Sequence, residues 1–321
     1  MAPVNGFIVG GLLGAVIAAF ALIAGRGLSS VAVRRALGVL ASLVLMISLG
    51  ATFFGYWLAS GDRSPIAAYE ITDGVMYERL LIDDAVAHLM SFDLSNPCLA
   101  LTTTAVRPDG SVDALRTTAW AEQEGAVAAI NSNYFFPYDA GWPWGDPTPV
   151  EGGEVNILGT VKRDGEEPIS ASSEFGRVRH RVWIDADNVG HVGLELADDA
   201  VVAVTGRELI LESGQVVGHE SDNYPRTVVG IAEDTSQMWW LVVDGKRPGY
   251  SVGVTFDEAA EFLASVGATD AVALDGGGST TMVANGGDGV QMLNLTRNQG
   301  IPNRERPIAN HLGLVPVAGC S

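Results

Sequence analysis

The stretch Ala271-Val-Ala-Leu-Asp-Gly-Gly-Gly-Ser-Thr-Thr-Met-Val283 is the most informative segment of this 321-residue sequence. An apolar, β-branched run leads into Asp275, three glycines follow, and three hydroxyl residues precede a second apolar run. This pattern predicts a strand, a glycine loop and a second strand. A dinucleotide fingerprint and a P-loop are excluded, because both need a helix after the glycines.

The glycine loop is the first candidate binding element. The three glycines carry no Cβ, so their N–H groups can approach a ligand closely and can form a nest that favours an anion. Asp275 is a candidate acid or base, and the hydroxyls of Ser279 and Thr280 add hydrogen-bond donors. The alternative is a tight turn whose glycines only supply positive φ.

The charge of the chain is unevenly distributed. The formal net charge is −19, but residues 1–60 contain three arginines and no acid. This leaves 16 basic and 38 acidic residues, or −22, for residues 61–321. So acidic a region is not expected to bind nucleic acid through a basic surface.

Two apolar stretches, residues 6–25 and 36–59, predict a two-helix transmembrane hairpin within residues 1–60. The second stretch ends in Phe53-Phe-Gly-Tyr-Trp57, whose aromatic side chains suit a membrane–water interface. A pair of buried core helices is the alternative for both stretches, and a signal peptide is the alternative for the first. The length of the uncharged runs argues against core helices, and the absence of a basic residue from residues 1–5 argues against a signal peptide.

Arginines predict the orientation of the hairpin. Arg26, Arg34 and Arg35 are expected in the connecting loop, so the positive-inside rule places that loop in the cytoplasm and both termini outside. The protein is thus predicted to be a two-pass membrane protein that contacts the lipid bilayer through residues 6–59. Gly6, Gly10 and Gly14 recur every four residues, a spacing that can bring two helices close together.

Residues 61–74 are expected to form a linker, and residues 75–321 a single domain. The two cysteines, Cys98 and Cys320, both fall in the part predicted to be extracytoplasmic, where a disulfide can form. Two free thiols are the alternative. Strands are predicted at 85–94, 98–106, 126–130, 227–231, 237–243 and 311–315, and helices at 115–124 and 255–266.

Polar residues at the ends of these strands are candidate ligand contacts. Asn131 ends a buried strand, although taken alone an ordinary turn with an Asn cap is the simpler interpretation. The irregular segment 138–149 resembles a lid, and its Trp142 and Trp144 either stack on a sugar or anchor the loop by packing. Arg226 and Asp244 are expected at the same end of an antiparallel pair, where a surface salt bridge is the simpler interpretation.

Other catalytic classes lack support in the sequence. The five histidines show no metal-ligand spacing, no Gly-x-Ser-x-Gly elbow occurs, and no Cys/His pairing is evident. Thr255 and Glu258 fit a capping box, so Glu258 is interpreted as a cap and not as a catalyst.

The sequence resembles the phosphodiester glycosidase family over most of residues 75–316. The resemblance rests on motifs that occur in the same order: Ala129-Ile-Asn131, Pro225-Arg-Thr-Val-Val-Gly230, Val243-Asp-Gly245, Tyr250-Ser-Val-Gly-Val-Thr-Phe-Asp-Glu258, Leu274-Asp-Gly-Gly-Gly-Ser-Thr280 and Arg306-Pro-Ile-Ala-Asn310. It implies one α+β domain with a strongly twisted mixed β-sheet and few helices, here preceded by the transmembrane hairpin. Ser132 and Asn133 stand where the family usually has glycines.

The resemblance implies hydrolysis of a sugar-1-phosphodiester. Bacterial members are often membrane-tethered and are connected with exopolysaccharide or cell-wall material. Asp244 and Asp275 are then the candidate catalytic carboxylates, and Asn131 and Asn310 the candidate ligands of sugar hydroxyls. The candidate phosphate site comprises Arg226, Arg306, Gly276, Gly277, Gly278, Ser279 and Thr280. No set of candidate ligands in the sequence requires a metal ion, although a divalent cation could bridge an aspartate and the phosphate.

Two other functions fit the same residues. In a non-catalytic glycan-binding module of this fold, the carboxylates would orient sugar hydroxyls without turnover. In a structural envelope protein, the polar motifs would only cap strand ends.

Overall fold

The computed structural model describes residues 2–25, 30–136, 149–171, 179–219, 221–298 and 301–320. The predicted lid segment with Trp142 and Trp144 lies almost entirely outside these residues. The chain divides into two compact units, Met1–Asp62 with Arg247–Tyr250, and Arg63–Lys246 with Ser251–Ser321.

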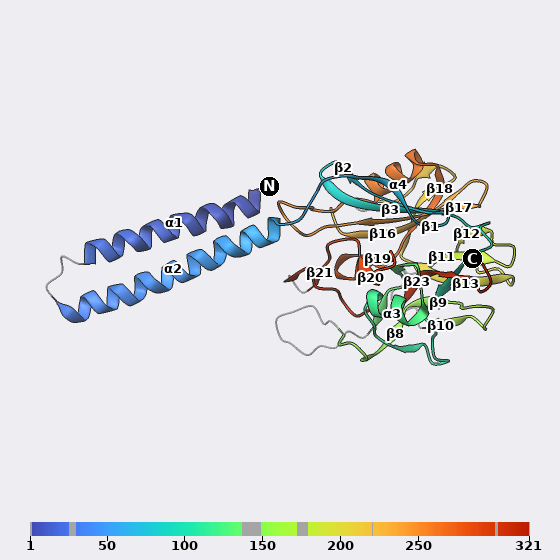
Figure 1. Ribbon diagram of the computed structural model, residues 1–321, viewed down its shortest axis with the longest axis horizontal. Coiled ribbons are helices and arrows are strands. Elements are labelled where there is room, and N and C mark those ends of the chain that lie inside the picture. Colours follow the sequence, from blue (N-terminus) through green and yellow to red (C-terminus); the bar gives the residue numbers. More distant parts are fainter. Residues whose placement is uncertain are drawn as a thin grey trace. The chain divides into compact units, whose positions relative to one another are not determined.

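The first unit contains helices α1 (Ala2–Gly25) and α2 (Val31–Ala59), which lie side by side (Figure 1). The glycines at the contact between the two helices are not all those that the sequence predicted. A Cβ on Gly11 would overlap Thr52 and Ser48, and one on Gly14 would overlap Ser48, whereas Gly10 has nothing within 4 Å. The contact therefore uses Gly11 and Gly14.

One helix in the described residues is long and apolar enough to cross a membrane, namely Val31–Trp57 of α2. The apolar part of α1 is shorter, at Gly10–Ile23, so the two-span hairpin is not confirmed. Arg34 and Arg35 lie in the first turns of α2 and not in a loop, because the helix begins at Val31 after the N-cap Ser30. Arg26 lies outside the described residues.

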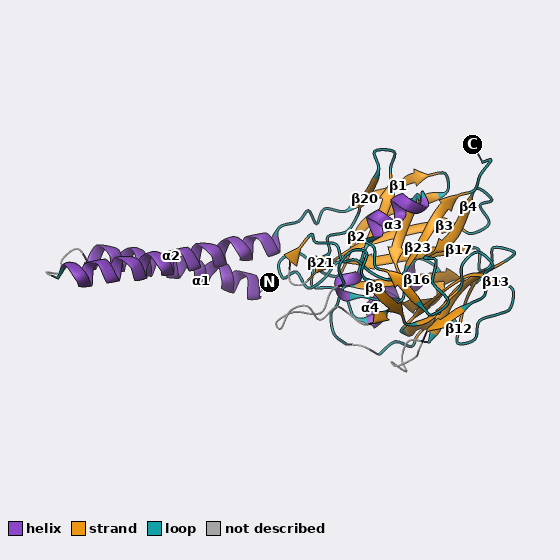
Figure 2. Cartoon of the chain, turned by 90° about the horizontal axis from the view of Figure 1, so that it is seen from below, coloured by secondary structure: helices purple, strands orange, loops and turns teal. Residues whose placement is uncertain are grey.

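β-Strands make up most of the regular secondary structure of the second unit (Figure 2). The larger sheet has the order β1 (Ile66–Thr72), β2 (Val75–Ile82), β3 (Ala85–Asp93), β17 (Gln237–Val243), β16 (Arg226–Ala232), β18 (Ala268–Ala273), β14 (Glu208–Glu212), β15 (Gln215–Val216). The second has the order β20 (Val290–Met292), β19 (Met282–Asn285), β6 (Ala128–Asn131), β23 (His311–Pro316), β4 (Leu99–Thr103).

Smaller sheets and two helices complete the unit. The sheets are β12 (Gly190–Gly193), β11 (His180–Asp185), β13 (Ala200–Gly206); β5 (Ser111–Asp113), β8 (Glu154–Ile157), β7 (Phe135–Phe136); β10 (Ile169–Ala171), β9 (Gly159–Val161); and β21 (Arg297–Asn298), β22 (Ile301–Pro302). The helices are α3 (Thr117–Glu124) and α4 (Phe256–Ser265), and α4 has the predicted capping box.

The α+β class with few helices is confirmed, but two details of the fold prediction are wrong. Every strand pair among the described residues is antiparallel, so no mixed sheet occurs there. Hairpins and sheet-to-sheet crossings connect these strands, and neither needs a parallel neighbour. In addition, Ile66–Thr72 of the predicted linker forms strand β1 on the edge of the larger sheet.

The larger sheet is buried on both faces where it carries the site. Along β17, Met238, Trp240 and Val242 join one hydrophobic cluster, while Trp239 and Leu241 join a second cluster with α4. The first cluster also takes in Ile130, Met282 and Leu312 of the smaller sheet. Because successive side chains point to opposite faces, an unbroken apolar run such as 238–243 is what a doubly covered strand requires.

The strand–loop–strand prediction for the quoted stretch is confirmed, and it connects the two sheets. β18 belongs to the larger sheet and β19 to the smaller one, and the loop between them contains the 3₁₀ turn Gly277–Ser279. The second strand begins at Met282, after the turn that includes Ser279. Elsewhere, Cys98 and Cys320 form a disulfide, which decides between the two alternatives left open by the sequence.

Candidate active site

Four neighbouring strand ends of the larger sheet form the framework of the site. In the order β17, β16, β18, β14, the residues at one edge are Asp244, Arg226, Asp275 and Arg207. The register places them together, since Arg226 pairs with Val243, and Ala273 pairs with both Val228 and Glu208. The antiparallel hairpin prediction for Arg226 and Asp244 is therefore confirmed.

Asp275 lies at the centre of this edge and is only 8% exposed. Burial raises the pKa of its carboxyl from 3.8 to about 6. Hydrogen bonds from the Ser279 side chain and the Gly276 backbone, together with the charge of Arg306, act in the opposite direction on this pKa. The result is a carboxylate that is ionised at neutral pH and protonated by mild acid.

The three glycines allow two large side chains to contact the loop. Gly277 has a φ of +66°, and a Cβ there would lie 2.9 Å from Cε1 of Tyr224. A Cβ on Gly278 would overlap the Arg306 guanidinium, and one on Gly276 would lie 2.8 Å from the Pro225 carbonyl oxygen. The absence of Cβ atoms thus brings Tyr224 and Arg306 to the loop backbone.

Asn131 is fully buried, and its side chain joins the two sheets beneath the loop. Its Nδ2 donates to the Asp275 carbonyl oxygen at 2.5 Å, and its Oδ1 accepts from Thr227 Oγ1 at 2.6 Å and from Thr281 N at 3.0 Å. In return, Asp275 N donates to the Ser132 carbonyl oxygen at 2.9 Å. These bonds fix the backbone on both sides of the Asp275 carboxyl.

Asn310 is also fully buried and lies in a separate network. Its Nδ2 donates to Asn133 Oδ1 at 2.9 Å, and its Oδ1 accepts from Thr103 Oγ1 at 3.0 Å. Asn133 in turn bonds the backbone of Leu158 and Thr205. Both asparagines predicted to bind sugar hydroxyls are thus engaged with protein groups.

Asp244 is buried, and only 1% of the residue is exposed to solvent. Its Oδ1 accepts from Leu295 N at 2.9 Å and from Asn294 Nδ2 at 3.1 Å, and its Oδ2 lies 3.3 Å from His88 Nε2. Asn294 also donates to the Thr280 carbonyl oxygen at 3.2 Å. Asp244 therefore connects the β17 end to the segment that follows the glycine loop, and its carboxylate is already occupied.

Arg226 is 4% exposed and is likewise bonded to the protein. Its Nε donates to the Val254 carbonyl oxygen at 3.1 Å and its Nη2 to the Asp222 carbonyl oxygen at 2.8 Å. Its guanidinium stacks on Phe256, 4.0 Å from the ring centroid. Of the two predicted clamp arginines, Arg226 thus holds the surrounding loops, while Arg306 contacts the glycine loop.

Two cationic residues that the sequence analysis missed join Arg306. Lys246 Nζ lies 3.7 Å from the Tyr224 ring centroid and donates to its hydroxyl, and Arg297 Nη1 donates to the Lys246 carbonyl oxygen. Arg306 donates to Asn298 Oδ1 at 3.2 Å and to Ser279 Oγ at 3.4 Å. Among the described residues, Lys246, Arg297 and Arg306 form no salt bridge with a carboxylate.

Lys246 and Arg306 both reach the loop, and Arg297 is connected to it through the Lys246 carbonyl oxygen. Lys246 touches Tyr224, Tyr224 touches Gly277, and Arg306 touches Gly278 and Ser279. The signal that could have revealed Lys246 is its place two residues after Asp244. Arg297 carries no such local signal.

Tyr134 lies near Asp275. Its side chain is hydrogen-bonded to Arg207, and burial, followed by the charge of Asp275, raises the pKa of its hydroxyl above the ordinary value. Tyr134 is therefore a neutral donor at physiological pH. Thr280 Oγ1, beyond the loop, is buried and has no hydrogen-bond partner within the described part of the chain.

A pocket of about 660 Å³ runs beside β14. We call it the β14 pocket, and its lining residues are Arg179, His180, Arg207, Glu208, Leu209, Glu212, Val217 and His219. Arg207 connects it to Tyr134 and so to the Asp275 region.

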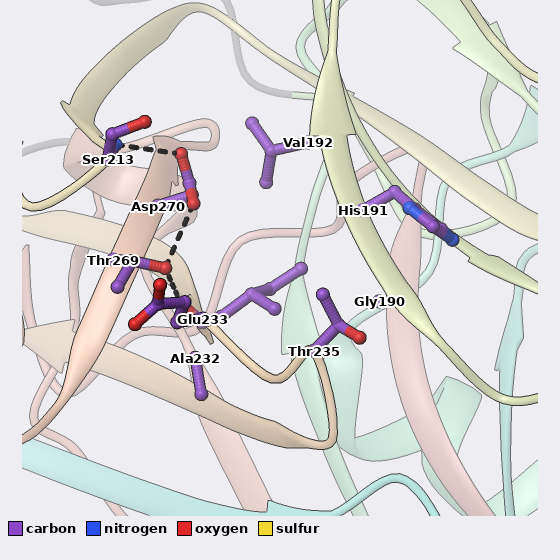
Figure 3. A pocket seen from close by; sticks show the side chains of 10 residues that line it. Gly190, His191, Val192, Ser213, Ala232, Glu233, Thr235, Thr269 and Asp270 are labelled. Carbon is purple, nitrogen blue, oxygen red and sulfur yellow. Dashed lines mark hydrogen bonds between the residues drawn. The ribbon is translucent and has the colours of Figure 1, made fainter.

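A second pocket of about 380 Å³ lies at the end of β16 and the start of β18, which are the strand ends away from Asp275 (Figure 3). It contains Glu233 of the β16–β17 turn and Asp270 of β18, and Asp270 accepts from Ser213 N at 3.2 Å and from Thr269 Oγ1 at 3.0 Å. Neither Asp275 nor any of the three cations lines this pocket. Over the described residues, no group of three His, Cys, Asp or Glu side chains is arranged to hold a metal ion.

Comparisons with known proteins concern the family and the fold. A family model described as phosphodiester glycosidase matches residues 124–315. No curated protein matches the chain.

Among solved structures, the chain is similar to the catalytic domain of zebrafish N-acetylglucosamine-1-phosphodiester alpha-N-acetylglucosaminidase, auto-inhibited by its pro-peptide. The identity is 18%, the TM-score is 0.57, and the match covers 78% of this chain and 87% of the other. It is also similar to a hypothetical protein from Synechocystis, with 13% identity, a TM-score of 0.51, and coverage of 79% of this chain and 64% of the other. At these identities the likeness supports the fold.

Proposed function

This chain belongs to the phosphodiester glycosidase family, and on that premise we propose that it hydrolyses a sugar-1-phosphodiester at the edge where Asp275 lies. One observation carries the proposal. Three cationic side chains without carboxylate partners in the described residues surround the glycine loop that follows a buried carboxylate. In a domain with a formal charge of −22, this is an arrangement suited to an anionic ligand.

The phosphate site comprises Arg306, Lys246 and Arg297, with Ser279 as a hydroxyl donor. Arg306 is the central residue, because its guanidinium packs on Gly278 and reaches Ser279. Guanidinium groups bind phosphate oxygens through paired, charge-assisted hydrogen bonds. Arg226 supports the site by holding the loops that contain Asp222 and Val254.

Asp275 acts at the anomeric carbon as nucleophile or as general base. Both roles require the ionised carboxylate, and the pKa of about 6 provides it at neutral pH. The phosphate is a good leaving group once its charge is bound, so general acid assistance contributes little. A single reacting carboxylate is sufficient, and Asp244, Asn131 and Asn310 serve to position the loops around it.

The same proposal includes a membrane tether and an extracytoplasmic site. The apolar α2 helix supports a membrane span, and α1 packs against it through Gly11 and Gly14. The Cys98–Cys320 disulfide supports an oxidising compartment for the second unit. Cell-wall material or exopolysaccharide is the substrate class that such a location favours.

The test uses the full chain in detergent. It is incubated with UDP-N-acetylglucosamine and with α-sugar-1-phosphate methyl esters, with and without EDTA, and sugar release is followed by mass spectrometry. Release that disappears in Asp275→Asn and Arg306→Gln, but persists in the matched variant Asp270→Asn, supports the hydrolase. Loss of release with EDTA would add a divalent cation to the site.

The alternative is a non-catalytic glycan-binding protein of the same fold. The observation that favours it is the β14 pocket, which is polar and adjoins the site. Ligand binding without sugar release from any donor would favour this alternative and contradict the hydrolase.

A further inference from the structure

The β14 pocket lies on the side of Asp275 opposite to the phosphate-binding cations. In the strand order β17, β16, β18, β14, Lys246 follows β17 on one side of Asp275, and Arg207 precedes β14 on the other. Arg207 N donates to the Ala273 carbonyl oxygen at 2.8 Å, so the inner end of the pocket adjoins the strand that ends at Asp275. A ligand that spans Asp275 therefore has the cations at one end and this pocket at the other.

The lining of the pocket suits a neutral, hydroxyl-rich ligand. Glu208 and Glu212 supply carboxylate acceptors, Arg179 and Arg207 supply donors, and the charges of these four residues cancel. Burial lowers the pKa of His180, which keeps that imidazole neutral at physiological pH. A simple anion gains little from such balanced charges, whereas a sugar ring can use both donors and acceptors.

The pocket extends along β14, from Arg207 at its inner end to Glu212. Arg207 and Glu212 both line the pocket and are five positions apart, and five steps of extended chain span at most roughly 17 Å. This length leaves room for a sugar next to Asp275 and for further glycan beyond it.

We infer that the β14 pocket is the sugar subsite of this enzyme, with Glu208 and Arg207 as residues that determine which sugar is accepted. The inference rests on the proposed function, and it assigns a direction to the substrate. The phosphate lies toward Arg306, Lys246 and Arg297, the anomeric carbon lies at Asp275, and the sugar ring extends past Tyr134 into the pocket. The Tyr134 hydroxyl, held by Arg207, donates to the sugar.

Binding of the two halves of the substrate is measured separately. The full chain is purified in a sugar-free zwitterionic detergent, and saturation-transfer NMR gives the affinities for N-acetylglucosamine, glucose and glucuronate. Inorganic phosphate binding is measured by ³¹P line broadening. The variants are Glu208→Gln, Arg297→Gln and the matched control Glu233→Gln, which lies in the pocket of Figure 3, and thermal melting verifies that each is folded.

We expect Glu208→Gln to weaken binding of the preferred sugar by about 10-fold, the effect of one charged hydrogen bond, and to leave phosphate binding within about twofold. Arg297→Gln gives the reverse pattern, and Glu233→Gln changes neither affinity. Equal loss of both ligands in Glu208→Gln, loss of sugar binding in Glu233→Gln, or no binding of any of the three sugars to the unaltered chain overturns the subsite. Because no turnover is needed, a chain that binds sugar in this pattern but releases none from phosphodiesters contradicts the hydrolase alone.

Discussion

Asp244 and Asp275 follow neighbouring strands of one sheet at the same edge, yet their surroundings differ completely. The Asp244 carboxylate accepts hydrogen bonds from Leu295 N and Asn294 and adjoins His88, so its oxygens are occupied by the protein. The Asp275 carboxylate accepts hydrogen bonds from Ser279 and the Gly276 backbone of its own loop, and desolvation raises its pKa. Two identical side chains at equivalent strand ends thus divide into a structural anchor and the carboxylate that we propose as the reactive group.

The largest expected effect is on catalysis through Asp275. Asp275→Asn removes the only carboxylate of the pair that is available to a ligand, so kcat should fall by about 10³-fold or more. Steady-state sugar release per folded enzyme, with folding verified by circular dichroism, provides the measurement. Residual activity within tenfold of the unaltered enzyme would contradict the role of Asp275.

Asp244→Asn should instead act on stability. It breaks a buried network around His88 and Leu295, and such losses cost about 3–4 kcal/mol of the free energy of unfolding. Chemical denaturation gives the stability, and kcat of the folded fraction should fall far less than in Asp275→Asn. An unchanged unfolding free energy together with abolished turnover would make Asp244 a second catalytic carboxylate and break the comparison.

The desolvated carboxylate of Asp275 should carry a cost in stability. Its pKa is raised from 3.8 to about 6 in the folded protein, so the unfolded chain loses this proton more easily. The resulting penalty on folding grows as the pH rises from 3.8 to about 6 and is complete above that pH. Asp275→Asn should therefore stabilise the protein by about 2–3 kcal/mol at pH 7.5, and the difference should vanish below pH 3.8 as both forms become neutral. Melting curves across this range are the check, and a destabilised variant at pH 7.5 would contradict the prediction.

The smallest effect concerns the pH profile. If the ionised Asp275 is the reacting form, kcat/KM falls on the acid side with an apparent pKa near 6. Arg306 lowers the pKa of Asp275, so Arg306→Gln should move this limb to higher pH by roughly half a unit. A limb that moves to lower pH would show that another group controls the profile.

The sequence predicted the local elements of the site well. Asp275, the glycines and the capped α4 helix are contiguous patterns, and each reflects interactions within a few residues. The Arg226–Val243 pairing was also accessible, since a hairpin of two apolar runs joins residues near in sequence.

Contacts between residues far apart in the sequence could not be predicted. Lys246 and Arg297 meet only because the β21 segment packs beside the glycine loop, and no spacing in the sequence marks that contact. The hydrogen bonds of Asn131 were not predictable for a related reason, since its partners Thr227 and Thr281 lie far along the chain. The all-antiparallel sheets and the use of Gly11 in place of Gly10 likewise depend on which surfaces meet.

The disulfide has a consequence for how the protein withstands proteolysis. Cys98 and Cys320 are 222 residues apart and enclose both sheets' central strands within one covalent ring. A protease that cuts once anywhere inside this ring opens it without releasing a fragment. Nicked molecules would therefore keep their mass on a non-reducing gel and separate into two pieces only after reduction, so damage to the second unit would remain hidden until a reductant is present.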